Sequence, residues 1–117
     1  MASSSRTLPA ADRAIIELTK VADYLLNAGH PDNGGKARFF ASFGFAPSAP
    51  ERLVAALKKL AENGEVVLEL SSTHGTKYVV DGRLEAPGDR QPSVRTIWIV
   101  DTEQAFPRLV TAYPHED

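Results

Sequence analysis

Residues 62–70 read ENGEVVLEL, and the hydrophobic pattern of the chain changes its period inside this stretch. Before Gly64 the apolar residues recur at the three- and four-residue spacing of an amphipathic helix. After Gly64 they alternate with polar residues, as in strands. Asn63-Gly64 is a suitable end for a helix. We therefore predict an α+β fold, in which N-terminal helices precede a four-stranded antiparallel β-meander that packs on them.

The helix that ends at Asn63 has the clearest pattern of the three predicted helices. Ser48 and Glu51 have the spacing of a capping box, in which two side chains bond reciprocally to backbone amides. Such a helix needs one apolar face to pack against the sheet. That face consists of Leu53, Leu57, Leu60 and Ala61.

Two shorter helices are predicted nearer the N-terminus. One begins after Thr19, a residue type that caps helices well, and the other covers about residues 34–43 and ends at Gly44. Residues 13–18, RAIIEL, fit either a strand or the start of a helix. We expect a flexible tail at residues 1–11, a single domain at 12–114 and a short tail at 115–117. The aromatic residues expected in the core are Phe39, Phe40, Phe43, Phe45 and Trp98.

Four strands are predicted after Gly64, at residues 65–70, 76–84, 93–100 and 108–113. The turns between them are too short for parallel connections, so the strands should be antiparallel. Asp81-Gly82 fits a β-bulge. Strict alternation along the last strand places Leu109, Thr111 and Tyr113 on one face, and Arg108, Val110 and Ala112 on the other.

The composition excludes several kinds of function. The chain has no cysteine, which rules out disulfides and thiolate chemistry and suits a reducing cytoplasm. Its three histidines are scattered without metal-ligand spacing, so no metal or cofactor is expected. No apolar run approaches the roughly 20 residues of a membrane span, so no membrane partner is expected. Because the formal net charge is −2, any nucleic acid would have to bind at a local basic patch.

Residues 29–40, GHPDNGGKARFF, form the candidate functional stretch. The first amides of a helix have no internal partner, and the helix dipole adds positive potential there. Two glycines allow close approach of a ligand, and two cations follow them. An anion, above all a phosphate, would suit this helix start, although an ordinary solvated loop has the same composition. The candidate residues are His30, Gly34, Gly35, Lys36 and Arg38.

The predicted sheet has one face free of helices, and its polar side chains would suit RNA. Tyr113 or Tyr78 could stack on a base, while Thr111, Arg95 and Lys77 could hold phosphates. The alternative is purely structural, because Thr and Tyr are good strand formers.

Five segments resemble a family of small bacterial domains that occur beside antitoxin-like partners or at the ends of larger toxin-like chains. These segments are KVADYLLNAGHP at 20–31, KARFF at 36–40, GTKYVV at 75–80, VRTIWIV at 94–100 and PRLVTAY at 107–113. The order of elements is also similar to the ribonuclease-toxin superfold of barnase, EndoU, the tRNase colicins and RelE. This resemblance implies metal-independent cleavage of RNA by attack of the 2′-OH on the adjacent phosphate.

Within that implied chemistry, His30 would be the acid or base and Lys36 would stabilise the phosphate, which Thr111 and Arg95 would hold. The second proton-transfer group is not evident, and His74 and Lys20 are candidates.

The partners implied by the resemblance are a tRNA or mRNA substrate and a cognate antitoxin or immunity protein. The alternative is a non-enzymatic binding module, itself an immunity or antitoxin partner. A small acidic domain suits that role because it can cover the basic site of a toxin.

Overall fold

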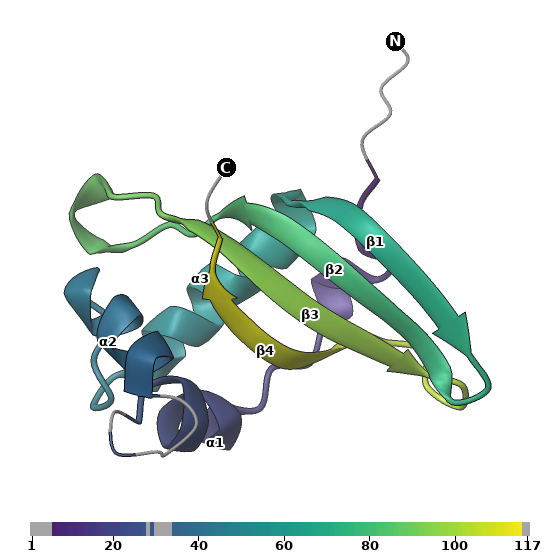
Figure 1. The fold of residues 1–117 in the computed structure, drawn as a ribbon, viewed down its shortest axis with the longest axis horizontal. Coiled ribbons are helices and arrows are strands. Elements are labelled where there is room, and N and C mark those ends of the chain that lie inside the picture. Colours follow the sequence, from purple (N-terminus) through teal and green to yellow (C-terminus); the bar gives the residue numbers. More distant parts are fainter. Residues whose placement is uncertain (1–5, 28, 30–33, 116–117) are drawn as a thin grey trace, which may run out of the picture.

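The computed structural model describes residues 6–27, 29 and 34–115. Helices precede a four-stranded antiparallel sheet with the strand order β1-β2-β3-β4, which confirms the predicted α+β fold and the meander. Helix α3 crosses behind one face of the sheet, and α1 and α2 lie at the β4 side (Figure 1). No helix among the described residues is long and apolar enough to cross a membrane. The strands are β1 (Glu65–Ser72), β2 (Gly75–Arg83), β3 (Ser93–Asp101) and β4 (Arg108–Pro114).

Helix α3 (Pro50–Asn63) buries the predicted stripe of three leucines and Ala61 against the sheet. Trp98 of β3 is fully buried, as expected. The predicted capping box of Ser48 and Glu51 is wrong, because Ala49 occupies the N-cap position and no side chain caps the helix. Pro50 begins the helix instead, where its missing N–H leaves no additional donor without a partner.

Helix α1 (Leu18–Lys20) continues directly into the π-helical segment η2 (Val21–Leu25). Glu17 holds the N-cap position, so the prediction that Thr19 caps this helix is wrong. Before it, a 3-10 turn η1 (Ala11–Arg13) leads to Ile15, which exchanges backbone hydrogen bonds with Pro107 and Leu109 at 2.8 and 2.9 Å. The ambiguous residues 13–18 therefore contain a single bridge to the last strand rather than a strand of their own.

The N-terminal segment differs from the expected tail over residues 6–11. Leu8 is only 3% exposed and packs in the core. The backbone carbonyl of Arg6 accepts a hydrogen bond from Val66 at the edge of the sheet. These contacts bring residues 6–11 into the folded domain.

Helix α2 (Gly34–Ser42) covers almost the predicted range and ends before Gly44, whose φ of 97° is the left-handed conformation expected at a helix end. Phe40 and Phe45 are buried, and Phe39 and Phe43 pack against the core from its margin.

Two β-bulges decide which side chains lie on each face of the sheet. Strands β2 and β3 pair without a shift in register, so the predicted bulge at Asp81-Gly82 is wrong. The register shifts instead in β1 and in β4. In β4, Thr111 pairs with Ile97 and Leu109 pairs with Trp98. Val110 lies between them as the extra residue.

Because of the bulge at Val110, the prediction that Leu109 shares a face with Thr111 and Tyr113 is wrong. An extra residue shifts the alternation by one position. Leu109 and Ala112 therefore both face the helices and are buried. Thr111 and Tyr113 face the side of the sheet that α3 does not cover, and we call this side the open face (Figure 1).

Candidate functional site

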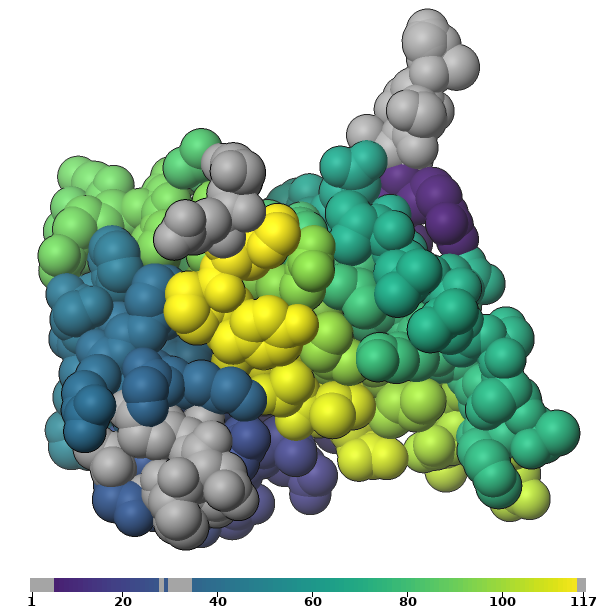
Figure 2. All heavy atoms as spheres, viewed as in Figure 1, coloured from purple at the N-terminus to yellow at the C-terminus, as the bar shows by residue number. Residues whose placement is uncertain are grey.

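Lys36 brings three segments of the chain together at one edge of the open face. It lies in the first turn of α2, which sits beside β4 (Figure 2). Its Nζ donates hydrogen bonds to Thr111 Oγ1 at 2.9 Å and to Tyr24 Oη at 3.2 Å. The same ammonium lies 5.1 Å from the centre of the Tyr24 ring and 5.7 Å from that of Tyr113. The α2 cation is therefore held by η2 on one side and by β4 on the other.

The charge of Lys36 is not neutralised by a carboxylate in the described part of the chain, where none forms an ion pair with it. Its partners there are hydroxyls and aromatic rings, which hold an ammonium without cancelling its charge. Lys20 adds a second ammonium 5.9 Å from the centre of the Tyr24 ring. Two ammonium groups thus lie against the Tyr24 ring at this edge of the sheet, where they could attract an anion.

A second polar group lies further across the open face. Arg95 donates from Nε and Nη2 to the two carboxylate oxygens of Asp81, each at 2.7 Å. His115 Nε2 lies 3.3 Å from Asp81 Oδ2 and 3.4 Å from Arg95 Nη2. The hydrogen bonds to Asp81 are the main cause of a raised pKa of the Arg95 guanidinium, and Tyr113 acts in the same direction. This bidentate, partly buried pair is a strong one and keeps Arg95 charged.

Tyr113 connects the two groups. It pairs with Arg95 across β3 and β4, and Arg95 in turn pairs with Asp81 across β2 and β3. Side chains directly opposite one another on neighbouring strands are about 5 Å apart, so these side chains form one continuous row. We call this row the polar strip. It consists of Lys36, Thr111, Tyr113, Arg95, Asp81 and His115.

The strip contains four of the residues predicted to form the site. Lys36, Thr111, Arg95 and Tyr113 come from separate parts of the sequence and lie together on the open face. Lys77 lies on the same face, but it is four residues from Asp81 along β2, or about 13 Å.

Other predicted residues lie elsewhere. Tyr78 faces the helices opposite Trp98, and burial, followed by the nearby Glu69, raises the pKa of its hydroxyl. Arg38 is exposed two residues after Lys36, and residues two apart lie on different sides of a helix. His74 is in the β1–β2 turn, at the other end of the sheet from α2 (Figure 1).

The remaining predictions concern the start of α2. Gly34 is its first residue, and Gly35 is exposed with open space where a side chain would begin. His30 lies outside the described residues, so its role stays a prediction.

Sequence reasoning missed three members of this arrangement. Tyr24 lies in a predicted helix and is not among the predicted site residues, although its hydroxyl accepts a hydrogen bond from Lys36. Asp81 was assigned to a bulge, although its pairing with Arg95 follows from the register of β2 and β3. His115 was placed in the C-terminal tail, whereas its backbone N–H donates to Ser93 at 3.0 Å. Knowledge of strand register would have found the last two.

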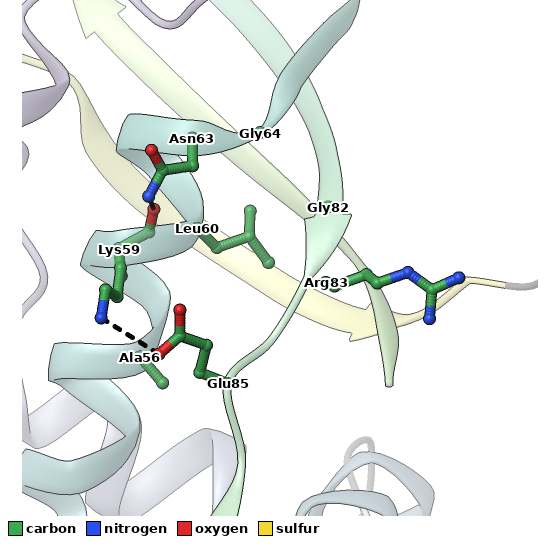
Figure 3. A pocket seen from close by; sticks show the side chains of 8 residues that line it. All are labelled: Ala56, Lys59, Leu60, Asn63, Gly64, Gly82, Arg83 and Glu85. Carbon is green, nitrogen blue, oxygen red and sulfur yellow. Dashed lines mark hydrogen bonds and ion pairs between the residues drawn. The ribbon is translucent and has the colours of Figure 1, made fainter. Parts of the chain in front are cut away.

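A separate hollow of about 210 Å³ lies between the end of α3 and the end of β2 (Figure 3). Lys59 and Glu85 form an ion pair of 3.0 Å at its mouth, and both side chains are more than half exposed. The rest of the wall is lined by Leu60, two glycines, Ala56, Asn63 and Arg83. The lining contains no residue of the polar strip, and its lysine is already paired. We therefore do not include this hollow in the candidate site.

Comparison with known proteins gives two matches. The family model described as a domain of unknown function (DUF6883) matches residues 7–116. No curated protein matches the chain. Among solved structures, a chain of a contact-dependent growth inhibition toxin–immunity protein complex from Klebsiella pneumoniae 342 is similar, with a TM-score of 0.70 and 14% identity. The match covers 92% of this chain and 97% of that one, and at this identity it shows a shared fold.

Proposed function

This chain belongs to the DUF6883 family of domains of unknown function, and we propose that it is a toxin that cleaves RNA at the polar strip. The observation that carries this proposal is the Lys36 ammonium, which hydroxyls and aromatic rings hold on the open face with no ion-paired carboxylate among the described residues. The structural neighbour from a toxin–immunity complex supports a place in a toxin system. The likeness to the ribonuclease-toxin superfold remains a prediction.

The proposed reaction develops negative charge where the strip has its donors. When the 2′-oxygen of RNA attacks the adjacent phosphorus, the O2′–P bond forms and the P–O5′ bond breaks. Charge grows on the nonbridging oxygens in between. Lys36 would stabilise that charge, an effect worth about 10²–10³-fold in related cases, and Thr111, which accepts the hydrogen bond from Lys36, would help to hold the phosphate. The Tyr113 ring would stack on a neighbouring base. His30 stays a proposed acid or base.

A non-enzymatic role as an immunity protein or similar binding module is a second candidate, favoured by a different surface. Leu68 and Leu70 are 44% and 52% exposed on β1, which is an edge strand. Exposed apolar side chains on a sheet edge are typical of a docking surface. The complex that contains the similar chain includes an immunity protein as well as a toxin. The shared fold is therefore compatible with a toxin and with an immunity protein.

Inducible expression in bacteria distinguishes the two candidates. We expect the wild type to arrest growth and to fragment tRNA or mRNA, and a folded Lys36→Ala variant to do neither. If the wild type is harmless and leaves purified tRNA and mRNA intact, the ribonuclease proposal is abandoned. Capture of a toxin by the purified wild type, with loss of capture in Leu70→Asp, would then support the binding role.

A further inference from the structure

The far end of the polar strip is a histidine with the geometry of a proton-transfer group. The His115 ring is 31% exposed, and its Nε2 lies 3.3 Å from Asp81 Oδ2. Nε2 also lies 3.4 Å from Arg95 Nη2, so this nitrogen stands between the acceptor Asp81 and the donor Arg95. In the neutral ring one of the two nitrogens carries a lone pair, which can accept a proton.

Two contacts with the rest of the protein hold His115 in place. Its backbone N–H donates to Ser93, which anchors the residue immediately after β4. The Asp81 carboxylate that contacts the ring is itself fixed by the two hydrogen bonds from Arg95. A base that is oriented in this way loses little entropy when it meets a substrate.

His115 also borders a space in which a ligand could lie. A hollow of about 170 Å³ is lined by Asp81, Gly82, Arg83, Ser93 and His115. This hollow adjoins the Arg95 end of the strip, because Asp81 belongs to both. A substrate that crosses the open face from Lys36 would therefore reach the imidazole.

We propose that His115 is a catalytic residue, the general base of the RNA cleavage, and that Asp81 is its positioning residue; this inference rests on the proposed function. Neutral His115 takes the 2′-OH proton as the O2′–P bond forms. The P–O5′ bond breaks with its electron pair on O5′, which receives a proton from a water molecule. The imidazolium left on His115 is stabilised by the Asp81 carboxylate.

The charged and titratable groups around His115 come from all three neighbouring strands. Asp81 and Arg83 belong to β2, Arg95 to β3 and Tyr113 to β4. The Asp81 carboxylate attracts the imidazolium that the proton transfer leaves, and the two arginines repel it. Removal of the carboxylate should therefore slow the transfer of the proton to His115.

The test is the pH dependence of RNA cleavage by the full-length protein, compared with His74→Ala as a matched histidine control. We expect His115→Ala to reduce kcat by about 10²–10⁴-fold and to remove the acidic limb, with partial recovery when imidazole is added. Asp81→Asn should lower kcat with little change in KM, because it removes the group that positions the base and not the base itself. His74→Ala should match the wild type, because His74 is exposed in the distant β1–β2 turn.

The two levels of the proposal fail in distinguishable ways. If the wild type cleaves RNA and folded His115→Ala keeps both the rate and the acidic limb, the role of His115 is wrong and the ribonuclease assignment stands. A His115→Gln variant that behaves as the wild type would lead to the same conclusion. If the wild type does not cleave RNA, both proposals fall.

Discussion

The polar strip and the hollow beside α3 each contain a lysine, but the two lysines have opposite surroundings. Lys59 pairs with Glu85 at 3.0 Å, and both side chains are largely in solvent. Lys36 is half-buried and contacts two hydroxyls and two aromatic rings. An exposed ion pair leaves little charge to attract a ligand. The comparison shows that a lysine alone does not identify a candidate anion site. The groups that contact the lysine decide whether its charge is available to a ligand.

The largest effect should come from the apolar wall of the hollow and should concern stability alone. Leu60 is 3% exposed between α3 and the sheet. Leu60→Ala should lower the free energy of unfolding by about 2–5 kcal/mol, measured by urea denaturation. The cleavage rate per folded molecule should not change. A loss of that rate with the fold intact would show that the hollow takes part in the reaction.

The next effect should come from the lysine of the strip. Lys36→Met keeps the length of the side chain and removes its charge, so we expect RNA cleavage to fall by about 10²–10³-fold. Lys59→Met is the matched control and should cleave at the wild-type rate. Equal rates for all three proteins would remove the distinction between the two regions.

A smaller effect is expected at the hydroxyl that holds the lysine. Thr111→Val preserves the shape and the strand preference of the residue and removes the acceptor of the 2.9 Å bond. A hydrogen bond to a charged group contributes about 1.5–3 kcal/mol, so kcat should fall roughly tenfold to a hundredfold. A single-turnover assay would measure this loss, and a rate within twofold of the wild type would mean that Thr111 does not position Lys36.

The smallest effect belongs to the exposed pair. Glu85→Gln should lower the free energy of unfolding by less than about 1 kcal/mol. The difference from the wild type should vanish at about 1 M salt, where the screening length is near 3 Å. Thermal denaturation at low and high salt would measure it. A large loss that persists in salt would show that Glu85 has a packing role.

Much of the fold could be predicted because helices and strands depend on local periodicity. The stripe of α3 and the alternation of β3 around Trp98 are examples, and so is the end of α2 at Gly44. The faces of β4 could not be predicted, because the extra residue at Val110 is apparent only once β4 pairs with β3. The cap of α3 was also wrong, since Pro50 begins the helix without a side-chain bond.

The candidate site could be predicted in part, because local periodicity placed some of its residues on helices and strands. Lys36 was identified by its place at a predicted helix start, and Thr111, Arg95 and Tyr113 by their residue types on predicted strands. Tyr24 and Asp81 were missed because their roles depend on neighbours 12 and 14 residues away in the chain.

The sequence alone determined the order of helices and strands, the antiparallel sheet and the identity of the cations available to a ligand, because these depend on spacing and residue type within short segments. Only the tertiary structure decided which side chains meet. The bulge in β4 turned Thr111 and Tyr113 toward the open face, and the packing of α2 beside β4 brought Lys36 to them. The register of β2, β3 and β4 placed Asp81, Arg95 and His115 together. These arrangements depend on pairing between distant segments, whose energies no local pattern encodes.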